Sequence, residues 1–94
     1  MPYLLIRQRF TDYEQWRAAF DSVAEQRTAL GLETVIAAPA PDDPDQAVVL
    51  FRFDDLAQVR RHFPSPELAD AHERGGVLPG STEAVFLAEV PASD

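Results

Sequence analysis

The sequence predicts an α+β fold in which four antiparallel strands form one sheet and the helices pack on one of its faces. Strand-like and helix-like segments follow one another in the order β-α-β-β-α-α-β, and no repeat, linker or low-complexity segment interrupts them. This order is typical of ferredoxin-like α+β folds. The length of 94 residues is that of one domain, so we expect residues 1–94 to form a single unit.

The first strand and the first helix are defined by periodicity and by caps. Residues 3–10 are rich in aliphatic side chains and predict a strand. Thr11 and Asp12 can each cap a helix, and apolar side chains then recur every three or four positions. Gly31 suits the left-handed conformation that often ends a helix. We therefore expect one helix across residues 13–30.

The next two strands are expected to flank an acidic loop. Residues 32–38 predict a weak strand, because two alanines and Pro39 close it, whereas residues 47–53 (AVVLFRF) predict a strong one. The segment between them, PAPDDPDQ (39–46), contains three prolines and three aspartates. We expect it to be an exposed hairpin loop.

Two short helices and a final strand complete the predicted order. The aspartates at 54–55 can cap a helix that Pro64 stops. Ser65 precedes a proline and an acid, which predicts a helix over residues 66–74 that two glycines end. Residues 83–90 predict the last strand.

The strands are apolar on both faces. In AVVLFRF, Val48 and Leu50 point to one side while Val49 and Phe51 point to the other. The helices can cover only one face, and a large exposed apolar face is unfavourable for a monomer. We therefore expect a homodimer whose two sheets face each other.

Four segments carry a resemblance to a known family: DYEQWRAAFD (12–21), VVLFRFDD (48–55), FPSPELADAHERGGV (63–77) and VFLAEV (85–90). Over almost its whole length the chain resembles small bacterial members of the dimeric α+β barrel superfamily, which includes antibiotic-biosynthesis-monooxygenase-like proteins. The resemblance implies that two subunits form a dimeric α+β barrel. Its members include cofactor-independent monooxygenases, polyketide cyclases and haem-degrading enzymes, so the resemblance implies no single reaction. It also implies a histidine where Gln8 stands and an apolar residue, commonly methionine, where His72 stands.

Three side chains are candidate catalytic residues: His72, Arg7 and Arg52. An imidazole has a pKa near neutral pH, so His72 could act as a general base on an acidic phenol or a β-dicarbonyl carbon. A guanidinium could hold a carboxylate or a developing enolate. The alternative for His72 is a partly exposed helix residue. The alternative for the arginines is cross-strand pairing with acids such as Glu33 and Glu83.

Six further residues are expected to contact a ligand: Tyr13, Trp16, Phe51, Phe53, Phe86 and Gln8. Tyr13 and Trp16 combine a large apolar body with one polar atom, which suits the wall of a pocket for a flat aromatic ligand. The alternative for the five aromatic side chains is packing in the core.

The composition excludes several classes of function. The chain has eight basic groups, all arginine, and sixteen acidic groups, and its net charge of −8 opposes binding to nucleic acid or to anionic membranes. No apolar run approaches the length of a membrane span, and the N-terminus turns polar too soon for a signal peptide, so we expect a cytoplasmic protein. There is no cysteine, and the two histidines match no metal-binding spacing, so we expect neither a metal nor a bound cofactor.

The leading hypothesis is a small cofactor-independent enzyme, a cyclase or a monooxygenase, acting on a hydrophobic aromatic or polyketide-like molecule. The ligand would lie between sheet and helices, beside His72 and either Arg7 or Arg52. The alternative is a dimer that binds a small ligand, or serves as an accessory protein, without catalysis.

Overall fold

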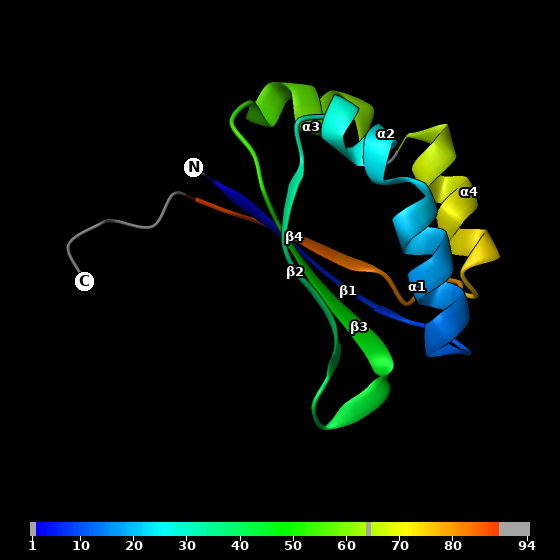
Figure 1. Ribbon diagram of the computed structural model, residues 1–94. Coiled ribbons are helices and arrows are strands. Elements are labelled where there is room, and N and C mark those ends of the chain that lie inside the picture. The colour runs from blue at the N-terminus through cyan, green and yellow to red at the C-terminus, as the bar shows by residue number, and fades with distance from the viewer. Residues whose placement is uncertain (1, 64, 89–94) are drawn as a thin grey trace.

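The computed structural model describes residues 2–63 and 65–88 as a helical layer packed against one sheet (Figure 1). None of its helices has the apolar length that a membrane crossing requires. The elements are, in chain order, β1 (Tyr3–Arg9), α1 (Tyr13–Ser22), α2 (Ala24–Ala29), β2 (Glu33–Ala40), β3 (Asp43–Arg52), α3 (Leu56–His62), α4 (Pro66–Arg74) and β4 (Glu83–Leu87).

The four strands form one antiparallel sheet in the order β2-β3-β1-β4. Central strand β1 pairs with β3 on one side and with β4 on the other, so that Leu5 lies opposite both Leu50 and Val85. All the helices lie on one side of this sheet (Figure 1). The predicted α+β architecture is confirmed. The predicted last strand is observed as far as Leu87, and its final residue, Val90, lies outside the described residues.

Side-chain caps start three of the helices. Asp55 accepts a hydrogen bond from the amide of Gln58 at 3.1 Å, and Ser65 accepts one from the amide of Leu68 at 3.3 Å. Each cap satisfies an N–H group that the first helical turn leaves without a partner, so α3 and α4 begin where the sequence predicts. Of the two candidate caps before α1, Asp12 is the one that accepts a hydrogen bond, from the amide of Gln15 at 3.0 Å.

The expected single helix across residues 13–30 is wrong, because Val23 separates α1 from α2. Val23 has φ −114° and ψ 26°, outside the helical region, and its amide turns back to the carbonyl of Phe20 at 3.4 Å. This tighter i→i−3 bond ends α1 and redirects the chain. Gly31 adopts the predicted left-handed conformation, with φ 83°.

The expected exposed loop at residues 39–46 is also wrong. β2 and β3 continue through most of this segment and leave a turn only at residues 41–42. The backbone is paired here, since the amide of Phe10 donates to the carbonyl of Asp45 at 3.1 Å. Pro39 is tolerated because β2 is an edge strand, where a missing N–H group costs little.

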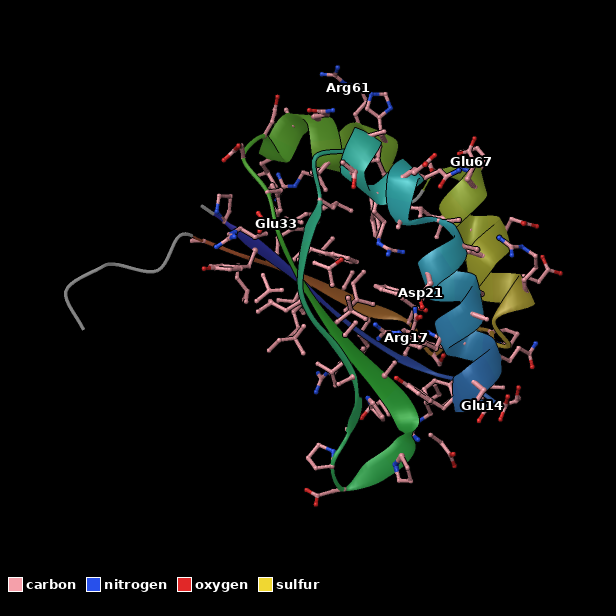
Figure 2. All side chains as sticks on the ribbon, in the orientation of Figure 1. Glu14, Arg17, Asp21, Glu33, Arg61 and Glu67 are labelled. Atoms are coloured by element: carbon pink, nitrogen blue, oxygen red, sulfur yellow. The ribbon has the colours of Figure 1, made fainter. Side chains whose placement is uncertain are left out.

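The side chains of alternate residues divide the sheet into two different faces. On the face that the helices cover, Leu4, Phe51 and Phe53 are at most 3% exposed. On the opposite face, which we call the open face, Ile36 and Val85 are 53% and 43% exposed. Side chains project from the open face, and none of the helices within residues 2–63 and 65–88 lies above them (Figure 2). In this described part of the chain, the sheet therefore has one buried face and one apolar face that no helix covers.

Candidate functional site

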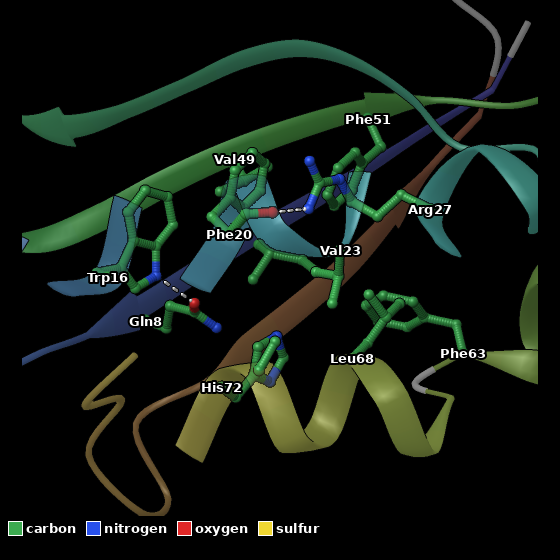
Figure 3. Close-up of a pocket in the computed structure, with 12 residues that line it drawn as sticks. Gln8, Trp16, Phe20, Val23, Arg27, Val49, Phe51, Phe63, Leu68 and His72 are labelled. Atoms are coloured by element: carbon green, nitrogen blue, oxygen red, sulfur yellow. Dashed lines mark hydrogen bonds between the residues drawn. The ribbon is translucent and has the colours of Figure 1, made fainter. Parts of the chain in front are cut away.

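A pocket of about 450 Å³, a volume that includes its open mouth, lies between the covered face of the sheet and helices α1, α2 and α4 (Figure 3). Val49 and Phe51 form part of the wall on the sheet side. Among the described residues of the lining, the polar side chains are Gln8, Arg27 and His72.

Gln8 and Trp16 form a buried polar pair at this pocket. β1 directs Gln8 into the covered face, where it is 3% exposed. Its Oε1 atom accepts a hydrogen bond from the indole Nε1 of Trp16 at 2.8 Å, and its Nε2 atom donates to Oγ1 of Thr82 at 3.3 Å. Because both ends of the amide have partners, the amide orientation and the indole plane are fixed. The structure therefore places Gln8 and Trp16 at the pocket, as the sequence predicts.

His72 lines the same pocket from α4. Burial lowers the pKa of its imidazole below the usual 6.5, because removal from water disfavours the charged form. The ring is therefore mostly neutral at pH 7 and can accept a proton. Among the described residues, no side chain hydrogen-bonds the ring, and Leu68, one turn earlier on α4, has no group that could orient it.

Arg27 is the pocket residue that the sequence reasoning missed. It reaches in from α2 and is 7% exposed. Its Nη1 atom donates to the carbonyl oxygen of Phe20, and its Cζ atom lies 3.7 Å from the centroid of the Phe20 ring. Burial lowers the pKa of Arg27, and the charge of Asp21 offsets part of that shift. The sequence did contain a signal for this residue. Arg27 stands four positions after Val23, on the otherwise apolar stripe of the first predicted helix, where a side chain is expected to face the core.

Arg7 and Arg52 lie on the open face, so the expectation that one of them works beside His72 in the pocket is wrong. Nη2 of Arg7 lies 2.9 Å from Oε2 of Glu83, and Nη2 of Arg52 lies 2.6 Å from Oε1 of Glu33. The hydrogen bond that Arg52 donates to Glu33, together with the charge of that carboxylate, raises the pKa of Arg52. These ion pairs are the cross-strand pairs that were the alternative to a catalytic role for Arg7 and Arg52. Both arginines miss the pocket because successive residues of a strand point to opposite faces.

The predicted aromatic ligand contacts divide into two groups. Trp16 and Phe51 line the pocket, as expected. Tyr13 does not line it and instead stacks on Trp16, with 6.0 Å between the ring centroids. Phe53 and Phe86 meet edge to face at 6.0 Å and also lie outside the pocket lining. Tyr13, Phe53 and Phe86 thus lie outside this pocket and pack in or against the core, which was the alternative for these side chains.

Metal-ligating side chains do not gather in the part of the chain that the structure describes. Within residues 2–63 and 65–88, no group of three or more His, Asp or Glu side chains is arranged to hold a metal ion. The described lining of the pocket contains no carboxylate, and His62 is exposed at the end of α3. A mostly apolar lining with a few polar groups suits an organic ligand.

Comparison with solved structures identifies the fold. A proposed antibiotic biosynthesis monooxygenase from Caulobacter crescentus superposes with a TM-score of 0.76 and 13% identity, covering 96% of this chain and 90% of the other. A second such protein, from Chloroflexus aurantiacus, gives a TM-score of 0.68 and 20% identity, covering 100% and 98%. The chain has the antibiotic-biosynthesis-monooxygenase-like fold. No protein-family model matches it, and no curated protein matches it significantly.

The antibiotic-biosynthesis-monooxygenase-like fold alone does not fix an activity here. An uncharacterised NIPSNAP domain protein from Burkholderia xenovorans has the same fold, with a TM-score of 0.68, 19% identity, and 99% and 96% coverage. The resemblance implies a histidine at the position of Gln8 and an apolar residue at that of His72. In this chain both positions line the same pocket, with Gln8 on β1 and the imidazole of His72 on α4. The activity of this chain therefore depends on the side chains that line its own pocket.

Proposed function

We propose that the chain is a small enzyme that acts, without a bound cofactor, on a hydrophobic aromatic or polyketide-like molecule in this pocket. The observation that carries the proposal is the position of the His72 imidazole in an apolar pocket wall, where burial lowers its pKa and favours the neutral form. A neutral imidazole accepts a proton, and the apolar walls exclude water from the group that loses it. His72 is therefore the general base in this proposal, and its substrate is a phenol or a carbon acid next to a carbonyl.

The pocket supplies the remaining requirements for binding such a molecule. Phe51 and Trp16 offer flat apolar surfaces for an aromatic body. Because the hydrogen bond between Trp16 and Gln8 is already made, the wall is rigid before the ligand enters. The ligand does not have to order these side chains on binding.

Removal of the proton prepares the substrate for two reactions. In a cyclase, the carbanion attacks a carbonyl carbon of the same molecule, a C–C bond forms, and the imidazolium returns the proton to the new alkoxide. In a monooxygenase, the carbanion transfers an electron to dioxygen, which is then a second substrate, and the two radicals combine into a peroxide anion that takes the proton back from the imidazolium. The hydroperoxide then loses water as its O–O bond breaks and a carbonyl forms at the same carbon. Both reactions begin with the same proton transfer to His72.

The proton transfer can be measured without the natural substrate. We would follow deuterium exchange at the C1 position of 2-tetralone, an aromatic ketone, in D₂O by NMR. We expect the wild-type protein to raise the exchange rate at least about tenfold above buffer, since general bases contribute 10²–10⁴-fold in optimised sites. His72→Gln should return the rate to that of buffer, whereas His62→Gln, which changes the other histidine, should leave it unchanged. Equal rates for His72→Gln and the wild type would remove the base assignment.

A non-catalytic ligand-binding protein is the second candidate, and one observation favours it. Catalytic bases are usually oriented by a hydrogen bond from a third group, and no described side chain provides one to His72. Phe53 and Phe86 pack against each other outside the pocket lining, so they do not distinguish the two candidates. Binding of 2-tetralone without faster exchange would favour this candidate.

We also propose that a second copy of the chain covers the open face. The centre of this face is apolar, with Leu5, Leu50 and Val85 in register across three strands. The Arg7–Glu83 and Arg52–Glu33 ion pairs lie at its two ends. An apolar centre with a charged rim is typical of a subunit interface. Light scattering should give twice the 10.4 kDa mass of the chain, and the mass of one chain at micromolar concentration would contradict the proposal.

A further inference from the structure

Arg27 has a more unusual environment than the other charged side chains around the sheet. It is more than nine-tenths buried, and among the described residues that line the pocket it is the one with a permanent charge. An isolated buried cation is costly unless it is paired with a negative charge. The guanidinium does not escape this cost by losing its proton, because arginine stays charged in proteins.

No carboxylate forms an ion pair with Arg27 within the described residues, although the charge of Asp21 acts on it from a longer distance. Five other arginines lie within 4.0 Å of a carboxylate: Arg7, Arg9, Arg17, Arg52 and Arg74. Arg27 has no such partner there, although it is more buried than any of them. Oδ1 of Asp21, the acid whose charge raises the pKa of Arg27, instead lies 3.4 Å from Nε of Arg17, whose Nη1 atom donates to the carbonyl oxygen of Ala37 in β2 at 2.9 Å.

The structural role of Arg27 accounts for only part of its hydrogen-bonding capacity. Nη1 donates to the carbonyl of Phe20 in the last turn of α1, where a cation is favourable. Among the described residues this is its one hydrogen bond, whereas a guanidinium carries five N–H donors. Stacking on the Phe20 ring fixes the plane of the guanidinium but uses none of those donors. Donors in a fixed plane at the wall of a pocket are arranged to receive a planar anion.

We propose that Arg27 binds a carboxylate of the ligand, so that the substrates of this pocket are aromatic or polyketide-like carboxylic acids. This inference rests on the proposed function, because it assumes that the pocket binds a ligand. The carboxylate accepts hydrogen bonds from the unused N–H donors of Arg27, and the apolar body lies against Phe51 and Leu68. Arg27 and His72 enter the pocket from different helices, α2 and α4, so the anionic group and the reacting carbon occupy different parts of the ligand (Figure 3).

The test compares two probes of nearly equal shape that differ in charge: 2-naphthoate and 2-naphthamide. Their affinities would be measured by isothermal titration calorimetry at pH 7. We expect the wild-type protein to bind 2-naphthoate at least about tenfold more tightly, since a hydrogen bond to a charged group contributes about 1.5–3 kcal/mol and 1.4 kcal/mol is a factor of ten. In Arg27→Gln the two affinities should become equal, with that for 2-naphthamide changed less than about twofold.

Arg17→Gln is the matched control. Arg17 also lies over the Phe20 ring, at 5.6 Å from its centroid, but it is outside the pocket lining and is paired with Asp21. Its removal also takes away one positive charge beside Phe20, at a greater distance than the 3.7 Å of Arg27, and should leave the preference for 2-naphthoate intact. Loss of the preference in this control would overturn the direct contact by Arg27.

The remaining outcomes also decide the inference. Equal affinities in the wild type, no binding of either probe, or a preference that survives Arg27→Gln would each overturn it. If Arg27→Gln does not fold, Arg27→Lys keeps the charge without the planar fork, and it should bind 2-naphthoate more weakly than the wild type. The two proposals can also fail separately. If the wild type prefers 2-naphthoate but His72→Gln exchanges 2-tetralone as fast as the wild type, the result supports anion binding by Arg27 and contradicts the role of His72 as general base.

Discussion

The two faces of the sheet use arginine in opposite ways. On the open face, Arg7 and Arg52 each meet a glutamate and remain partly exposed to water. On the covered face, Arg27 is buried and meets a carbonyl and an aromatic ring, with no described carboxylate. Exposed ion pairs contribute little to stability and need no ligand, whereas a buried cation without an ion-pair partner is stabilised when an anion binds to it. Burial and pairing, more than residue type, therefore indicate which arginine belongs to a binding site.

The largest expected effect contrasts two neighbouring residues of β3 that point to opposite faces. Val49 is 2% exposed on the covered face, so Val49→Asp buries an unpaired charge and should unfold most of the protein, whose total stability is on the order of 5–15 kcal/mol. Leu50→Asp places the same group on the open face, where it should leave the monomer folded and dissociate the dimer. Circular dichroism and light scattering together separate these outcomes. A folded Val49→Asp variant would contradict the assignment of the faces.

The second prediction concerns pH and depends on His72 being buried on the covered face. Its pKa is lower in the folded state than the ordinary 6.5, so below about pH 6.5 the unfolded chain binds more protons than the folded one. Stability should therefore fall as the pH drops from about 6.5 toward the folded-state pKa of His72, and this part of the loss should be absent in His72→Gln. Urea unfolding of both proteins between about pH 5 and 7 measures the difference. If the free energies of unfolding of the two proteins changed in parallel with pH, the imidazole of His72 would have to be exposed to water in the folded state.

The smallest expected effect is on the open face. Arg7→Gln and Arg52→Gln should each lower the free energy of unfolding only slightly, because the side chains of both ion pairs remain partly exposed to water. Neither change should alter the preference for 2-naphthoate over 2-naphthamide. Chemical denaturation and the calorimetric titration check the two statements. If either variant lost its preference for 2-naphthoate, the anion would have to bind on the open face.

Local signals in the sequence predicted the starts and ends of helices well. Asp55 and Ser65 cap α3 and α4, and Gly31 follows α2, because a cap depends on a few neighbouring residues. The break at Val23 was not predictable from periodicity, since the apolar spacing continues across it. The length of the β2–β3 hairpin was also missed, because backbone pairing of the segment with Phe10 is a long-range contact.

The faces of the strands explain which site residues could be predicted. Gln8 and Arg7 are neighbours in β1, so their side chains must point to opposite faces, and the same argument separates Arg52 from Phe51. The alternation therefore excluded a pocket containing all four side chains. It could not tell which face the helices cover, because both faces are apolar. Only the packing of α1, α2 and α4 on the sheet places Gln8 and Phe51 at the pocket and both of these arginines outside it.

The central claim is that the covered face binds the ligand and the open face does not. NMR signals from the Trp16 indole N–H and the arginine Nε–H groups report on both faces during a single titration with 2-naphthoate. We expect the signals of Trp16 and Arg27 to shift together with one dissociation constant, while those of Arg7 and Arg52 stay in place. Shifts at Arg7 or Arg52 with Trp16 and Arg27 unchanged would contradict the claim.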